Sequence, residues 1–118
     1  MARFVSGLIT VLVFAGGVTL SARAAELSLT VVNVVSPQDV KIWEPTSIVA
    51  KKGDTVTLRL VNKHTDEHGY EIAAFGVKEV VSGEKTVTVS FTADKAGIFP
   101  IKCHLHPAHV VGQLVVLE

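Results

Sequence analysis

The stretch of residues 86–109 reads TVTVSFTADKAGIFPIKCHLHPAH. Its first part alternates polar with apolar residues and places Val87, Val89 and Phe91 on one face, which is the period of a half-buried β-strand. Its last part holds Cys103, the one cysteine of the chain, and three of the five histidines. A strand pattern therefore leads directly into a cluster of residue types that bind metals.

Short segments of the same β-type fill the chain from residue 25 to its end. Thr55–Asn62 alternates most clearly, and Pro37 and Pro45 bracket a short segment around residues 42 and 43. No segment after residue 24 has a helical period, and Gly, Pro and Asp turn signals separate seven or eight β-rich segments. This pattern predicts one all-β domain over residues 25–118, an antiparallel Greek-key β-sandwich. The expected strands cover residues 27–35, 48–50, 55–62, 70–74, 77–81, 86–91, 96–103 and 113–117.

The first 24 residues have the pattern of a targeting segment. Arg3 supplies a positive charge, Phe4–Leu20 is an uncharged apolar run, and Ala22-Arg23-Ala24 has the small-x-small form of a cleavage site. We therefore expect residues 1–24 to be a signal peptide cleaved before Ala25, with export to the periplasm. The alternative is a retained anchor, but the apolar run is interrupted by glycines and is shorter than the roughly 20 residues of a typical membrane-spanning helix.

The charge of residues 25–118 excludes one class of partner. Nine Lys/Arg against eleven Asp/Glu give this part a net charge of −2, and the positive side chains are mostly scattered singly. Nucleic-acid binding is not expected, because proteins that bind nucleic acids usually carry a basic patch, whereas the basic residues here are scattered. Membrane insertion after cleavage is not expected either. A single cysteine in an exported protein cannot form an internal disulfide.

The histidines gather in two short clusters, which are His64 and His68 in one polar loop and His104, His106 and His109 around Cys103. Thiolate sulfur with imidazole nitrogen suits copper and zinc, and two histidines with one cysteine form the trigonal core of a type 1 copper centre. We predict one copper ion per chain, cycling between Cu(I) and Cu(II). Zinc in a tetrahedral structural site remains an alternative. The predicted ligands are His68, Cys103, His106 and His109.

The two remaining histidines are expected to be non-ligands. His104 follows Cys103 directly, and adjacent residues of a strand point to opposite faces. His64 is expected to be an exposed loop residue.

These motifs carry a resemblance to a known family. Thr86–Phe99 followed by the Cys-x-x-His loop resembles the C-terminal signature of the cupredoxins. More narrowly, Val49–Glu118 resembles the nitrosocyanins, which are red copper proteins. The similar stretches are Lys51-Lys52-Gly53-Asp54, Ala74-Phe75-Gly76-Val77, Phe91–Gly97 and Cys103-x-Leu105-His106-Pro107.

The resemblance implies a β-sandwich with a mononuclear copper site. The cysteine and the first loop histidine of the nitrosocyanins match Cys103 and His106, and their second loop histidine matches His109 in a loop two residues shorter. Their fourth ligand is a glutamate, whereas the matching position here is His68; Glu67 and Glu71 lie nearby as substitutes. Nitrosocyanins form trimers, but the N-terminal extension is shorter here, so we expect a monomer or a small homo-oligomer.

The absence of methionine after residue 1 bears on the axial position of the site. Blue copper centres usually have a weak axial Met, with Gln or a backbone oxygen as variants. Here the axial role must fall to His109, to a backbone carbonyl or to no group. A strong axial imidazole favours Cu(II) over Cu(I) and so lowers the reduction potential.

Three functions are compatible with such a site. The leading hypothesis is one-electron transfer with a redox partner protein, without enzymatic activity. The second is periplasmic copper sequestration or delivery to a copper-handling protein, with His64 and His104 as auxiliary capture groups. The third is a nitrosocyanin-like site that binds or converts a small molecule such as nitric oxide. A binuclear centre of the copper A type is excluded because it needs a second cysteine.

Overall fold

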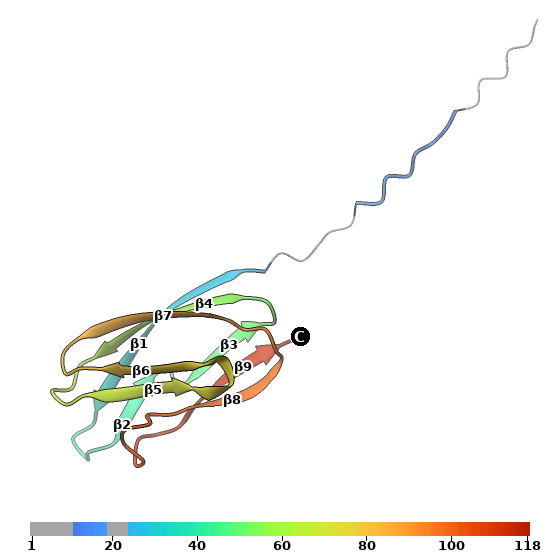
Figure 1. The fold of residues 1–118 in the computed structure, drawn as a ribbon. Helices are drawn as coiled ribbons and strands as arrows, with labels where there is room; N and C mark the ends of the chain where they lie inside the picture. Colours follow the sequence, from blue (N-terminus) through green and yellow to red (C-terminus); the bar gives the residue numbers. More distant parts are fainter. Residues whose placement is uncertain (1–10, 19–23) are drawn as a thin grey trace, which may run out of the picture.

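The alternating segments form nine strands in the computed structural model, which describes residues 11–18 and 24–118 (Figure 1). The all-β expectation is confirmed, and the only helical element in this described part is one turn of 3₁₀ helix, η1 (Ala73–Phe75). The strands are β1 (Glu26–Val35), β2 (Lys41–Glu44), β3 (Ser47–Lys51), β4 (Thr55–Asn62), β5 (His68–Ile72), β6 (Val77–Val81), β7 (Thr86–Thr92), β8 (Gly97–Ile101) and β9 (Gly112–Leu117).

The strands form mixed sheets, which corrects the expectation of a wholly antiparallel sandwich. One sheet has the order β2-β1-β4-β7, a second has the order β3-β9-β8, and β5 pairs with β6. The pairs β1–β4 and β3–β9 are parallel, and the other four pairings are antiparallel. The sequence missed these directions because an alternating pattern records which face of a strand is buried, not which neighbour it pairs with.

The core lies between the sheets and follows from the alternation. On β4 the side chains of Val56, Leu58 and Leu60 are fully buried, while Arg59 between them is exposed. Burying a large aliphatic side chain stabilises the fold by about 1.5–3 kcal/mol. The other buried apolar residues are Val31, Trp43, Ile48, Ala50, Tyr70, Ile72, Val77, Val81, Ala93, Ile101, Leu114 and Val116.

Buried polar side chains gather at one end of this core. Asn33 near the end of β1 and Asn62 at the end of β4 are directly opposite each other in the parallel pair, and both are buried. His68 and His109 are buried as well. Because buried polar groups must find partners, this end of the sandwich is where a specific site is expected.

The expected signal peptide, residues 1–24, falls mostly outside the described residues. Of this segment the structure describes residues 11–18 and Ala24, which form neither helix nor strand and are exposed. Within the described residues, no helix has the length and apolar character needed to cross a membrane.

Candidate metal centre

Cys103 lies just after β8, in the loop that leads to β9. A backbone bridge between Glu71 and Lys102, with N···O distances of 2.8 and 2.9 Å, holds this end of β8 against β5. The backbone N–H of Gly69 on β5 donates to Cys103 Sγ at 3.2 Å, and the Gly69 carbonyl accepts from Trp43 Nε1 at 2.9 Å. The buried sulfur is therefore held against β5 by the N–H of Gly69, and the carbonyl of that residue is held in turn by Trp43.

The loop after Cys103 curls through two turns that bring its histidines back toward the sulfur. The N–H of His106 donates to the Cys103 carbonyl at 3.4 Å, and the N–H of His109 donates to the His106 carbonyl at 2.9 Å. As a result, His106 Nδ1 lies 3.4 Å from Cys103 Sγ. The three-residue spacing of Cys103, His106 and His109 thus places their side chains at one end of the sandwich.

His68 enters the same place from the start of β5. Its ring is fully buried and lies 4.6 Å, centroid to centroid, from the ring of His106. Among the residues that the structure describes, one group has metal-ligand geometry: one ligand atom each from His68, Cys103 and His106, all within 4.8 Å of one another. Three of the four predicted ligands are therefore brought together from segments 35 positions apart in the sequence.

One atom of this group lacks a partner. His68 Nδ1 is buried and has no hydrogen-bond partner in the described part of the chain, whereas Nε2 of the same ring lies 3.0 Å from His64 Nδ1. A buried polar atom without a partner is costly, and a metal ion would supply the missing interaction. Thiolate sulfur and two imidazoles are the donor set of copper and zinc, so the residues fit such an ion.

Burial also keeps the imidazole rings of His68 and His109 neutral. It lowers the pKa of His68 to about 4, and the positive charges that His106 and His109 carry when protonated contribute in the same direction. Burial likewise lowers the pKa of His109. A neutral imidazole keeps a lone pair for a metal, so neither ring needs to lose a proton at neutral pH before it can bind one.

The structure places His109, the fourth predicted ligand, beside this group but not in it. Its ring lies 5.4 Å from the ring of His68 and stacks on Trp43 at 6.4 Å. Its Nε2 lies 2.9 Å from Asn33 Oδ1, and its Nδ1 lies 3.3 Å from the Val110 carbonyl.

The buried amides decide which nitrogen of His109 carries the proton. Asn62 Nδ2 faces the carbonyl oxygens of Asp66 and Val81 at 2.7 and 3.1 Å, so this atom is the amide nitrogen. Asn62 Oδ1 therefore accepts from Asn33 Nδ2 at 2.9 Å, which leaves Asn33 Oδ1 facing the ring. An amide oxygen and a backbone carbonyl can both only accept, and a neutral ring has one N–H to donate. The contact with Asn33 at 2.9 Å is shorter than that with Val110 at 3.3 Å, so we assign the proton to His109 Nε2, which leaves a lone pair on Nδ1.

The two histidines expected to be non-ligands occupy different positions. His104 packs against Gly69, where an added Cβ would lie 2.5 Å from His104 Nδ1, and this nitrogen is buried without a partner within residues 11–18 and 24–118. His64 differs from the expected exposed residue, because its side chain is only 27% exposed and contacts His68. Neither residue belongs to the group of three ligand atoms.

The nearby carboxylates considered as substitute ligands lie outside the group of three as well. Glu67 is exposed, and the Glu71 carboxylate lies 3.9 Å from the ammonium of Lys78.

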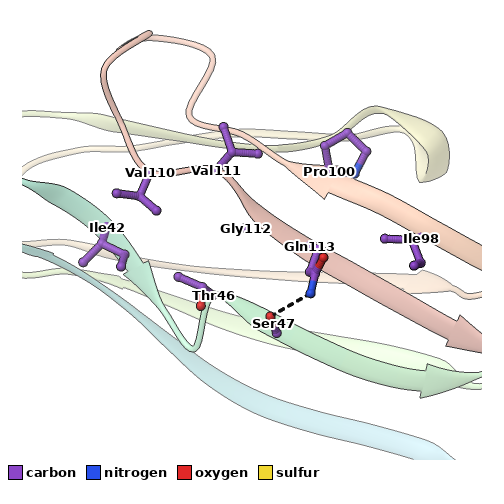
Figure 2. A pocket seen from close by; sticks show the side chains of 9 residues that line it. All are labelled: Ile42, Thr46, Ser47, Ile98, Pro100, Val110, Val111, Gly112 and Gln113. Carbon is purple, nitrogen blue, oxygen red and sulfur yellow. Dashed lines mark hydrogen bonds between the residues drawn. The ribbon is translucent and has the colours of Figure 1, made fainter.

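A groove opens beside the metal loop, lined by residues of β2, β3, β8 and β9 and of the segments next to them (Figure 2). It has a volume of about 580 Å³. Ile98 and Val111, both strongly exposed, and the hydrogen-bonded pair Gln113 and Ser47 lie along it. None of the predicted ligands lines the groove, so it is separate from the metal centre.

The low pKa of His68 predicts a pH dependence for the metal-free protein. Between about pH 6.5 and pH 4 the unfolded chain takes up a proton on this ring, whereas the folded protein does not. The free energy of unfolding should therefore fall by about 3 kcal/mol as the pH drops across this window. Chemical denaturation of metal-free protein at several pH values measures it. A His68→Gln variant cannot ionise at this position, so its free energy of unfolding should depend less on pH. An equal pH dependence in the two proteins would mean that His68 is not its source.

Comparison with known proteins supplies the family. A segment of 56 residues is 43% identical to nitrous-oxide reductase of Cupriavidus necator and covers 45% of this chain but only 9% of that protein. Copper nitrite reductase from Nitrosomonas europaea aligns with a TM-score of 0.68 at 19% identity, over 78% of this chain and 41% of the other.

Auracyanin A, a "blue" copper protein from Chloroflexus aurantiacus, aligns with a TM-score of 0.61 at 20% identity, over 77% of this chain and 98% of its own. At these identities the structural matches show the fold. The closer resemblance to nitrosocyanins stays a prediction. The cupredoxin-like domain model matches residues 7–116, and the chain therefore belongs to the cupredoxin-like family.

Proposed function

We propose that this protein is an exported copper protein that transfers single electrons through one Cu(I)/Cu(II) ion, without enzymatic activity of its own. The observation that carries the proposal is the group of one thiol and two imidazoles within 4.8 Å, in which His68 Nδ1 is buried without a partner among the described residues. Cys103, His68 and His106 would be the trigonal ligands. The similarity to nitrous-oxide reductases over 56 residues supports a role in redox chemistry.

The surroundings of the sulfur favour electron transfer over mere storage. An N–H group pointing at a coordinating sulfur withdraws charge from it and is one of the features that tune the potential of copper–thiolate sites. Here the Gly69 N–H donates to Cys103 Sγ, and the carbonyl of the same residue accepts from Trp43 Nε1. A sulfur held by an N–H of β5 would change position little between oxidation states of a bound copper ion, which would lower the barrier to electron transfer.

His109 is proposed as the fourth ligand, in the axial position. Its Nε2–H is donated to Asn33, so the lone pair on Nδ1 is available, and ligating histidines usually have an outer partner of this kind. The Val110 carbonyl, 3.3 Å from that nitrogen, can only accept a hydrogen bond and so does not occupy its lone pair. A firm axial imidazole favours Cu(II) and lowers the reduction potential.

Copper sequestration or delivery is the second candidate. His104 Nδ1, which is buried without a partner in the described part of the chain, lies beside Gly69 and immediately follows Cys103 in sequence. A second soft or borderline ligand next to the site would help to pass Cu(I) to another protein. A small-molecule site of the nitrosocyanin type would need an open position, which a bound His109 would fill.

Export is proposed from the first 24 residues, with residues 25–118 as the mature domain. The backbone nitrogen of Ala25 lies 3.1 Å from Asp54 Oδ1. After cleavage this nitrogen would be an ammonium group facing a carboxylate, which is favourable at the edge of the fold. The mature domain would meet a redox partner protein or a copper-handling protein in the periplasm.

The copper proposal predicts an intense thiolate-to-copper absorption band in the Cu(II) protein that bleaches reversibly on reduction. The Cys103→Ala variant should lose the band entirely, because the band arises from the sulfur. Leu105→Ala, in the same loop with its side chain partly exposed, should retain it. Visible absorption and EPR during a reductive titration measure both. Copper bound without this band would contradict electron transfer through Cys103 and favour sequestration.

The axial proposal predicts a spectral change and a higher reduction potential in His109→Ala. Removing an imidazole that prefers Cu(II) destabilises the oxidised state, and it also strengthens the remaining thiolate interaction. Spectroelectrochemistry of the two proteins makes the comparison. An unchanged spectrum and potential would mean that His109 is a bystander hydrogen-bonded to Asn33.

The export proposal predicts that protein recovered from a periplasmic fraction begins at Ala25. Intact-mass measurement and N-terminal sequencing test it. Full-length protein retained in the membrane fraction would indicate an uncleaved anchor instead.

A further inference from the structure

His64 contacts one of the proposed ligands directly. Its Nδ1 lies 3.0 Å from His68 Nε2, and the two rings are 5.2 Å apart, centroid to centroid, with 52° between their planes. The carboxylate of Asp66 is 3.9 Å from the same Nδ1, which is too far for a hydrogen bond. His68 is therefore the hydrogen-bond partner of this nitrogen.

The backbone holds His64 in place. Its N–H donates to Asn62 Oδ1 at 3.0 Å, and its carbonyl accepts from the Glu84 N–H at 3.0 Å. Asn62 is itself buried and bonded to Asn33. His64 is thus fixed to the end of β4 by the same amide that, through Asn33, orients His109.

Only one proton lies between the two imidazoles, and the surroundings of His68 decide where it is. If Nδ1 of His68 carried the ring proton, a buried N–H would be left without an acceptor in the part of the chain that the structure describes. If Nε2 carries it, the proton is donated to His64 Nδ1, and His68 Nδ1 keeps a lone pair. The second arrangement leaves no buried donor unpaired and presents a nitrogen to a metal.

We propose that His64 is a positioning residue of the metal centre: it accepts the Nε2–H of His68 and so fixes the orientation and tautomer in which His68 Nδ1 faces the metal. This inference rests on the proposed copper site. Its physical effect is to make His68 a more basic and better oriented ligand, because an acceptor on the far nitrogen raises the electron density at the ligating one.

Three variants test the proposal in the full chain. His64→Leu removes the acceptor and should weaken Cu(II) binding by about 10- to 100-fold, as measured by competition with a chelator of known affinity. It should also raise the reduction potential, because Cu(II) depends more than Cu(I) on a basic imidazole. His64→Asn should restore most of both, since the amide oxygen is as many bonds from Cα as Nδ1. Thr65→Ala, which changes an exposed neighbour in the same loop, should behave like the unaltered protein.

A second measurement needs no copper. In metal-free protein at neutral pH, ¹⁵N–¹H correlation spectra of the histidine rings should show His68 protonated at Nε2 and bare at Nδ1. A His68 ring protonated at Nδ1 would overturn the proposal, and so would His64→Leu matching Thr65→Ala in affinity and potential. If His64→Leu fails to fold, the spectrum of the unaltered protein still decides.

Failure of the copper site and failure of this inference give different results. If the unaltered protein lacks the thiolate-to-copper band, the proposed function fails. If the band is present but His64→Leu changes neither affinity nor potential, only the role of His64 fails.

Discussion

The hydrogen bond between the buried amides of Asn33 and Asn62 is the interaction on which the proposed metal centre depends. It crosses the parallel pair β1–β4 at the end where the apolar core stops. Leaving either amide unpaired in this interior would cost about 1–3 kcal/mol. Each amide has a further partner: Asn33 bonds His109, and Asn62 bonds the backbone of His64. One buried contact thereby orients groups from both histidine clusters.

That contact explains why the loops at this end need little rigidity of their own. The metal loop is exposed at several positions, yet its two ends are fixed, at Cys103 by the Gly69 N–H and at His109 by Asn33. His68 is fixed in turn by β5 and by its contact with His64. The donors are therefore oriented by the sandwich before any ion binds, and less ordering remains to oppose binding.

Much of this could be predicted from the sequence, and the limits have physical reasons. The alternation of Val56, Leu58 and Leu60 predicted β4 and its buried face. The clustering of histidines around Cys103, together with the second cluster that contains His68, predicted the site. The direction of strand pairing could not be predicted, because the alternation of polar and apolar residues does not tell which strand lies next to which in a sheet. The Asn33–His109 bond joins positions 76 apart, so no local pattern contains it. The role of His64 had one local signal, an Asn two residues earlier whose side chain can accept from its N–H.

The charge balance of the buried site bears on the choice between two candidate functions, electron transfer and copper delivery. A thiolate neutralises Cu(I), whereas Cu(II) with the same ligands carries a net positive charge, which burial disfavours. Neutral imidazoles with outer acceptors, as at His68 and His109, counter this by stabilising Cu(II), so the two oxidation states come closer in energy. A delivery protein needs the opposite arrangement, with ligands that leave easily. Here release would require His68, fully buried and held between β5 and His64, to give up its ion. The burial of His68 thus supports the proposal of an ion that stays bound.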